Sequence, residues 1–533
     1  MTADRGTART ASVAGAAALI TVLTVVARIA GFGRTFIFLH TVGTGPLGNI
    51  YNAANTIPNI VFELVAGGAL ASLVVPLLAG PVAAGDRART AAVTSALLTW
   101  VLTLLVPIAV LVALAAGPIA GLLRLPAAQE PLAADLLRIF APQLPLYGVG
   151  IVLTGLLQAH HRFAWPVLAP LLSSVTVMAA YLSYAAVDGP NSGIAGLSAA
   201  GRLFLGAGTT LGVVVLALCL LLPVRRLGLR LRPGYGFPGG EGRQAVRLGW
   251  AGAVTVGSQQ LVTAVVVGLT AHSFYTAYVA AQTVFLLPWA VLAVPLATAV
   301  YPRLAAAVAR GDDDGYRTAL SGTARSTVLL AGLGAAALAG LATPAAAVIG
   351  APSAAVGILG FAPGLFGYAL FALLSRALYA RGGTVAAAVA TATGWAVAGV
   401  AALLTPLVRD DQRQLLCLGL ATAAGLTVTG LALALAVRRS AGPAALRSLG
   451  RAVTVGIVAA GTAAVAGRAV VHAMNPTPTG WAGLGQGILG GTVVAVVFGV
   501  VAYALDRHDV RPLVARLTER LPAGRRGEAK ERQ

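Results

Sequence analysis

Long apolar runs separated by short polar segments repeat along almost the whole chain. Fourteen of these runs approach or exceed the roughly 20 apolar residues that a transmembrane helix needs. They lie at 11–39, 48–80, 88–116, 137–159, 163–186, 203–223, 244–270, 273–300, 318–342, 353–379, 383–406, 414–437, 446–470 and 482–505. This pattern predicts an all-α polytopic membrane protein with 14 transmembrane helices.

Basic residues between the runs predict the orientation of the chain. Segments that fall on the same side as the N-terminus hold 29 arginine and lysine residues, and segments on the opposite side hold 6. Basic residues concentrate in the cytoplasmic segments of membrane proteins. We therefore expect both termini in the cytoplasm, with a short N-terminal segment at 1–10 and a basic tail at 506–533.

Two stretches in different halves of the chain resemble each other. The stretches from Tyr51 to Pro76 and from Tyr278 to Pro302 share a tyrosine, two alanines, an amide residue and a threonine, and both end in proline. Internal duplication with a binding site at the repeat interface is typical of transporters. We predict two pseudo-symmetric six-helix lobes at 11–223 and 244–437, a glycine- and proline-rich cytoplasmic linker at 224–243, and two further helices within 446–505.

The composition supports the membrane interpretation and excludes other classes. Hydrophobic residues make up 58% of the 533 residues and charged residues 10%, whereas soluble proteins carry about 25% charged residues. The net charge of +20 would indicate nucleic-acid binding in a soluble protein, but here the charges lie in short loops. Cys219 and Cys417 both lie in apolar runs, so we expect no disulfide framework and no metal site. No phosphate-binding loop is present, and we expect neither a catalytic site nor a cofactor.

Three charged residues lie well inside the first two apolar runs, namely Arg28, Arg34 and Glu63. A charge at the bilayer centre costs several kcal/mol by most measures, so such residues usually face a cavity and mark function. Two arginines near the flexible Gly31 and Gly33 favour an anionic ligand, and phosphate is the anion that arginine binds best. The structural alternative is an ion pair between Glu63 and one arginine, although one carboxylate cannot neutralise both. We predict a substrate-binding site formed by Arg28, Arg34, Glu63, Asn49, Asn55 and Asn59.

The same stretch resembles a known family. The runs ARIAGFGR and NAANTIPNIVFELVAGGALASLVVPLLA are similar to the opening of the MurJ/MviN family of lipid II flippases in the MOP exporter superfamily. Segments 160–174, 203–215 and 284–305 resemble the fifth, sixth and eighth helices of that family, so the resemblance covers essentially the whole chain.

This resemblance implies a flippase that moves lipid-linked peptidoglycan precursor, lipid II, from the inner to the outer leaflet of the bacterial cytoplasmic membrane by alternating access. The diphosphate-sugar head would bind in a cationic cavity, where Arg28 and Arg34 match the two first-helix arginines of the family. The polyprenyl tail would lie in a groove beside the two helices of 446–505. The resemblance implies no enzymatic activity, and cell-wall synthases are the protein partners to consider.

Four positions depart from the family pattern and leave other functions open. Thr35, Asn49, Phe62 and Thr283 are uncharged where family members tend to carry a charge, which predicts a less cationic cavity. One alternative is an exporter of another polyprenyl-linked glycan or a small molecule with the same fold. The other is a non-transporting membrane scaffold for cell-wall synthesis. Transport could be driven by a proton carried on Glu63 or by the membrane potential.

Overall fold

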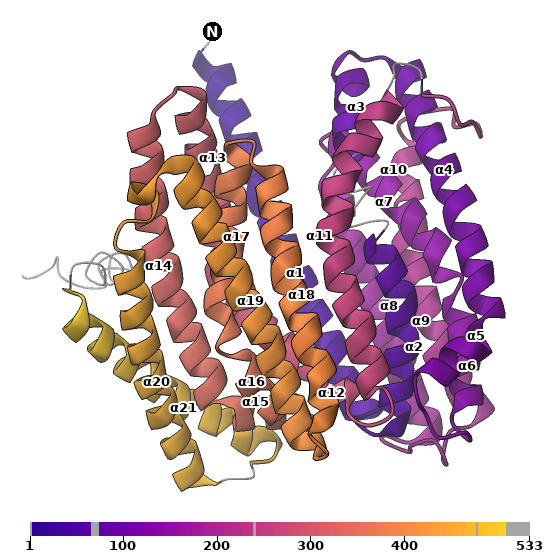
Figure 1. Ribbon diagram of the computed structural model, residues 1–533. Helices are drawn as coiled ribbons and strands as arrows, with labels where there is room; N and C mark the ends of the chain where they lie inside the picture. The colour runs from indigo at the N-terminus through magenta and orange to yellow at the C-terminus, as the bar shows by residue number, and fades with distance from the viewer. Residues whose placement is uncertain (1–2, 65–73, 238–240, 476–477, 508–533) are drawn as a thin grey trace, which may run out of the picture. The chain divides into compact units, whose positions relative to one another are not determined.

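A computed structural model of the chain describes residues 3–64, 74–237, 241–475 and 478–507, and every regular element in these residues is a helix (Figure 1). Among these described residues, twelve helices are long and apolar enough to cross a membrane, or thirteen if the bent pair Pro352–Phe361 and Gly364–Ala380 forms one span. The predicted all-α, multi-pass class is confirmed. The count is close to the predicted 14. The expected span at 48–80 is not among the spans found, and it includes residues 65–73, which lie outside the described residues.

The chain divides into two compact units, and the first comprises Met1–Thr283, Ile349–Gly357 and Thr391–Ala421. Its helices are α1 (Ala3–Thr41), α2 (Pro46–Glu63), α3 (Val74–Ala83), α4 (Arg87–Leu114), α5 (Ala116–Leu122), α6 (Glu130–Phe140), α7 (Gln143–Ala159), α8 (Ala164–Asp188), α9 (Ala199–Cys219), α10 (Leu221–Arg225), α11 (Glu241–Thr270) and most of α12 (Tyr275–Pro288), together with most of α18 (Thr384–Leu404) and parts of α16 (Ala355–Phe361) and α19 (Asp411–Ala441). In this unit α1 packs against α8, α8 against α9, and α7 against both α4 and α9 (Figure 1).

Local chemistry sets several helix ends in the first unit. The Asp86 carboxylate accepts a hydrogen bond from the Arg89 backbone N–H at 2.8 Å and caps α4. The Ser198 hydroxyl accepts from the Gly201 N–H at 3.0 Å and caps α9. Such caps satisfy the free N–H groups of a first helical turn. Gly189 ends α8 with a φ of 84°, which glycine adopts without steric cost.

An apolar core joins α3, α4, α7 and α10 and holds the scaffold of the first unit together. Leu78, Leu97, Leu153 and Leu156 are among its fully or almost fully buried side chains. Burying a leucine contributes roughly 1.5–3 kcal/mol. The described segment after α10 also joins this core, because Leu229 packs against it.

The second unit comprises Val284–Val348, Ile358–Ala390 and Thr422–Gln533. Its elements are a π-helical turn (Trp289–Ala293), α13 (Val294–Ala309), α14 (Asp313–Gly340), α15 (Ala342–Val348), α17 (Gly364–Ala380), α20 (Leu449–Met474), α21 (Gly480–Leu505), and parts of α12, α16 (Ala355–Phe361), α18 (Thr384–Leu404) and α19 (Asp411–Ala441). Helix α14 packs against α13, α17, α20 and α21. A Cβ atom at Gly332 of α14 would lie 3.1 Å from the Gly456 carbonyl oxygen of α20, so small residues permit this close packing.

Prolines account for irregularities in two of the predicted spans. The π-helical turn follows Pro288, and the 59° bend between α16 and α17 falls at Pro363. Proline lacks a backbone N–H and its ring clashes with the preceding turn, so it breaks or kinks a helix. The expected span at 273–300 is therefore part of one continuous helical segment, Tyr275–Ala309, with a π-helical turn inside it, whereas the span at 353–379 is a bent helix pair.

The predicted bounds of the two lobes and of the linker stay predictions. The predicted basic tail lies almost entirely in residues 508–533, outside the described residues.

Candidate functional site

A cavity of about 540 Å³ lies among α1, α2, α7, α8, α9 and the start of α12, entirely within the first unit. Arg34 is the one charged residue among the described residues that line it. The remaining polar lining consists of amides and hydroxyls from Thr35, Tyr51, Asn52, Asn55, Thr56, Asn59, Tyr147, Thr154, Ser173, Tyr181, Thr209 and Thr276.

Helix α2 contributes a row of amides to the cavity. Asn52, Asn55 and Asn59 recur at three- and four-residue intervals, which places them on one face of a helix with 3.6 residues per turn. The Asn59 side-chain amide donates to the backbone carbonyl of Asn55 at 2.9 Å. The Asn55 Oδ1 atom is buried without a hydrogen-bond partner among the described residues. An unpaired buried polar atom is costly, so Asn55 has capacity for a polar ligand.

A directed chain of hydroxyl groups forms another wall. The Thr209 hydroxyl donates its proton to the Leu205 carbonyl at 2.7 Å. The Tyr51 hydroxyl, 2.6 Å from Thr209 Oγ1, must therefore be the donor in that pair. Tyr51 then accepts from the Tyr181 hydroxyl at 2.8 Å. All three hydroxyl protons are donated within this chain, which holds the three side chains in place. The Tyr181 hydroxyl oxygen can still accept a hydrogen bond from a ligand.

Arg34 supplies the positive charge of the cavity. The positive charge of its guanidinium interacts electrostatically with the phenol groups of Tyr51, Tyr147 and Tyr181. Within the described part of the chain, Arg34 has neither an ion pair nor a hydrogen bond to its guanidinium. Since the described lining contains no carboxylate, the unpaired guanidinium and the neighbouring amides suit an anionic group with several oxygen atoms.

The other predicted arginine lies elsewhere. Helix α1 runs without a break from Arg28 through Gly31 and Gly33 to Arg34. Six residues correspond to a rise of about 9 Å and a rotation of about 240°, so the two side chains leave the helix in different directions. Arg28 and Arg34 are both exposed, but only Arg34 is among the residues that line the cavity.

Of the remaining predicted site residues, Asn55 and Asn59 line the cavity, whereas Asn49 and Glu63 do not. Asn49 is 2% exposed, donates to the Ser273 carbonyl and accepts from the Thr276 N–H at 2.9 Å. It therefore ties α2 to the first turn of α12. Glu63 is the exposed last residue of α2, and among the described residues it has no ion pair with Arg28 or Arg34.

Several lining residues were missed from the sequence. Asn52 follows the same helical stripe as Asn55 and Asn59, so periodicity could have identified it. Tyr181 and Thr209 lie 130 and 158 residues after Tyr51, and no local pattern links them to it. Thr35 and Phe62, two of the positions that depart from the family pattern, also line the cavity.

The second unit contains an apolar cavity of about 460 Å³ lined mainly by α14, α17, α19 and α20. Thr427 is the one polar residue among its described lining residues, and its hydroxyl donates to the Ala423 carbonyl at 2.8 Å. Helix α20 contributes Val453, Ile457 and Gly461, whereas none of the lining residues belongs to α21. We call this cavity the apolar groove.

Comparisons with solved structures place the fold. The chain aligns with an inward closed conformation of the lipid II flippase MurJ at a TM-score of 0.71 and 16% identity, covering 93% of this chain and 99% of the other. It aligns with an inward-facing multidrug resistance MATE family transporter of the MOP superfamily at a TM-score of 0.61 and 14% identity, covering 81% and 99%. The chain is a multi-pass membrane protein with the fold of MOP-superfamily transporters.

Sequence comparisons define the family. The family model described as lipid II flippase MurJ matches residues 38–484. A probable lipid II flippase MurJ of Synechocystis sp. is 29% identical over 235 residues, covering 43% of both chains. The lipid II flippase MurJ of Burkholderia cenocepacia is 27% identical over 333 residues, covering 60% of this chain and 63% of the relative. The aligned stretches thus cover about half of these relatives, and the chain belongs to the MurJ family of bacterial membrane proteins, which confirms the resemblance.

Proposed function

We propose that this protein is a flippase that moves lipid II from the inner to the outer leaflet of the bacterial cytoplasmic membrane. The observation that carries the proposal is the polar cavity of the first unit, with one unpaired arginine, a row of amides and no carboxylate in its described lining. Membership of the MurJ family supports the same substrate.

In the proposed mechanism, Arg34 binds the diphosphate of the precursor. A guanidinium makes charge-assisted, often bidentate hydrogen bonds to phosphate oxygens. Asn55 and Asn59 bind polar groups of the sugar-diphosphate head. Arg28, about 9 Å away along the axis of α1, binds the head at an earlier or later stage of transport. Release requires that these contacts weaken in the outward-open state.

The apolar groove of the second unit fits a polyprenyl chain. Its lining is hydrocarbon apart from a threonine whose hydroxyl is already bonded within its own helix. Apolar surface contributes roughly 25 cal/mol for each Å² buried, so an isoprenoid tail is retained without specific polar contacts. This assignment places the tail beside α20, the first of the two C-terminal helices expected to hold it.

We also propose that both termini lie in the cytoplasm and that the two predicted lobes move by alternating access. The protein would transport lipid II without enzymatic chemistry, and its partners would be cell-wall synthases. Glu63, with no ion pair in the described chain, is the proposed proton carrier if a proton drives transport. Transport measured in vesicles clamped at zero membrane potential, with and without a pH gradient, distinguishes transport driven by protons from transport driven by the membrane potential.

The test measures lipid II exposed on the outer leaflet of cells depleted of this protein and rescued with variants. We expect wild-type protein to restore exposure and Arg34→Ala to reduce the initial rate by about tenfold or more, because a hydrogen bond to a charged group contributes about 1.5–3 kcal/mol. Arg138→Ala is the matched control, since Arg138 pairs with Asp135 on an exposed surface.

Two outcomes would contradict the proposal. Unchanged lipid II exposure after depletion would indicate an exporter of another polyprenyl-linked glycan or small molecule. Normal growth and retained synthase binding in the double variant Arg28→Ala/Arg34→Ala would indicate a membrane scaffold without transport.

A further inference from the structure

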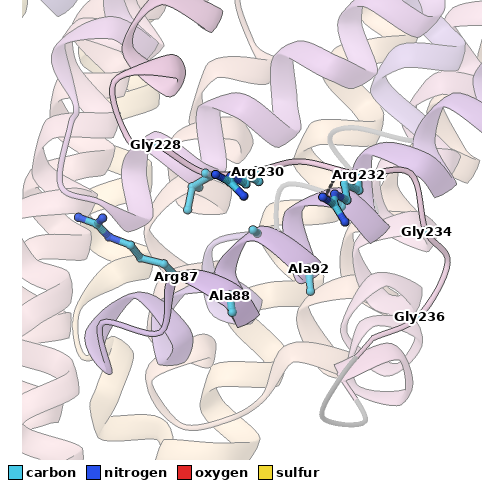
Figure 2. A pocket seen from close by; sticks show the side chains of 11 residues that line it. Arg87, Ala88, Ala92, Gly228, Arg230, Arg232, Gly234 and Gly236 are labelled. Atoms are coloured by element: carbon cyan, nitrogen blue, oxygen red, sulfur yellow. Dashed lines mark hydrogen bonds between the residues drawn. The ribbon is translucent and has the colours of Figure 1, made fainter.

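A second cationic feature lies apart from the transport cavity, at the start of α4. The described segment after α10 passes beside the first turns of α4 and encloses a cavity of about 550 Å³. Its charged lining consists of Arg87 on α4 and of Arg230 and Arg232 on the passing segment (Figure 2). We call this cavity, bounded by residues 87–95 and 228–236, the arginine cradle.

The passing segment is fixed to α4 at successive positions. The Arg232 N–H donates to the Ser95 hydroxyl at 3.0 Å, and the Gly234 N–H donates to the Thr99 hydroxyl at 3.0 Å. The Trp100 indole donates to the Tyr235 carbonyl at 3.1 Å, and the two rings meet edge to face at 5.1 Å. These bonds hold the cradle in one shape before a ligand arrives, which lowers the cost of binding.

The three guanidinium groups have unused binding capacity. Among the described residues, the side chains of Arg87, Arg230 and Arg232 form no ion pair and no hydrogen bond. The nearby carboxylate of Asp86 caps α4 and does not line the cradle. All three arginines line the cradle, although the Arg87 guanidinium extends away from Arg230 and Arg232 in Figure 2. An anion in the cradle is therefore stabilised by the combined positive charge of the lining and can form hydrogen bonds with its guanidinium groups.

The cradle has room for a headgroup and continues into a wider basic surface. Its floor on α4 consists of Ala88, Ala91 and Ala92, whose short side chains leave the volume open. Arg87 also lines a neighbouring cavity of about 260 Å³, together with His160, Arg162 and Arg226.

An exposed apolar track lies farther along α4, beyond the point where Gly234 and Tyr235 of the passing segment are bonded to Thr99 and Thr103. Val106, Val110 and Leu114 follow Ala92 and Thr99 at intervals of seven and four residues, which keeps them on one helical face. These three side chains are 44%, 51% and 76% exposed. Helix α4 is itself long and apolar enough to cross a membrane, so the cradle lies where a span meets the membrane surface and the track lies at the depth of acyl chains.

We infer that the arginine cradle binds the phosphodiester headgroup of an anionic membrane lipid, with an acyl chain along the exposed face of α4. Basic pockets beside transmembrane helices bind such headgroups, and arginine is the side chain best suited to phosphate. The apolar track favours a lipid over a soluble phosphate. This site is separate from the transport cavity and does not depend on what is transported.

The test measures the apparent Kd of the purified full-length protein in neutral detergent for phosphatidylglycerol and phosphatidylcholine by native mass spectrometry. We expect preferential binding of phosphatidylglycerol and a loss of about fivefold in affinity for each arginine replaced. The triple variant Arg87→Gln/Arg230→Gln/Arg232→Gln should therefore lose well over tenfold. The matched control Arg303→Gln/Arg310→Gln/Arg439→Gln removes the same charge from exposed positions outside the cradle and should change affinity by less than about twofold.

A charge-neutral variant keeps the test sharp if the triple variant is unstable. Ala92→Phe fills the floor of the cradle from an exposed helix position and should weaken phosphatidylglycerol binding without changing net charge. Equal losses in the cradle and control variants, or unchanged binding in both Ala92→Phe and the triple variant, would overturn the inference. Binding of glycerol phosphate or inorganic phosphate as tightly as the lipid would assign the cradle to a soluble phosphate instead.

Discussion

Replacing Asn49 by alanine should destabilise the first unit, because this side chain joins α2 to the start of α12. The substitution removes two hydrogen bonds, to the Ser273 carbonyl and from the Thr276 N–H. Thr276 is 1% exposed, so its N–H would be left without a partner in a buried position. A buried unsatisfied group costs about 1–3 kcal/mol and a lost hydrogen bond about 0.5–1.5 kcal/mol. We therefore expect the free energy of unfolding to fall by about 2–4 kcal/mol.

The assay is reversible unfolding of the purified protein by SDS in mixed micelles, followed by circular dichroism. Asn59→Ala is the matched control, because the Asn59 amide donates only within its own helix, and it should cost less than about 1 kcal/mol. Equal stability of the two variants would refute this reasoning.

Two further predictions concern the cavity wall and the apolar groove. Tyr51→Phe should lower the free energy of unfolding by about 1–3 kcal/mol, because Tyr181 and Thr209 both lose their buried partner; SDS unfolding of this variant beside Tyr147→Phe checks it, and equal losses would contradict the hydroxyl chain. Gly461→Phe should slow lipid II exposure severalfold with little change in unfolding, because a Cβ there meets open space in the groove. Gly485→Phe is its control outside the groove, and equal rates would remove the groove from the path of the tail.

The transmembrane architecture was predictable because the bilayer imposes a length and an apolar composition on every span. Thirteen of the predicted runs correspond to described helices or to the bent pair. Arg34, Asn55 and Asn59 were predictable as cavity residues, since a charge or a row of amides within an apolar run needs a polar environment. The separation of Arg28 from Arg34 was also available from helical periodicity, because six residues do not return to the same face.

Contacts between distant segments were not predictable. Asn49 meets partners more than 220 residues away, and its role at an interface follows from how α2 and α12 pack rather than from any local pattern. The hydroxyl chain depends on three helices meeting at one point.

The sequence by itself determined the class of the protein and most of its spans, and it narrowed the charge of the cavity to Arg28, Arg34 and Glu63, because these follow from the free energy of placing side chains in hydrocarbon. Only the tertiary structure decided that Arg34 alone of these three lines the described cavity. It likewise decided which polar residues share the cavity with Arg34 and which serve as ties between helices. It also decided that Arg230 and Arg232, which in sequence belong to a linker, lie beside Arg87. Packing and hydrogen bonding between segments far apart in the chain set these positions, and one-dimensional patterns do not encode them.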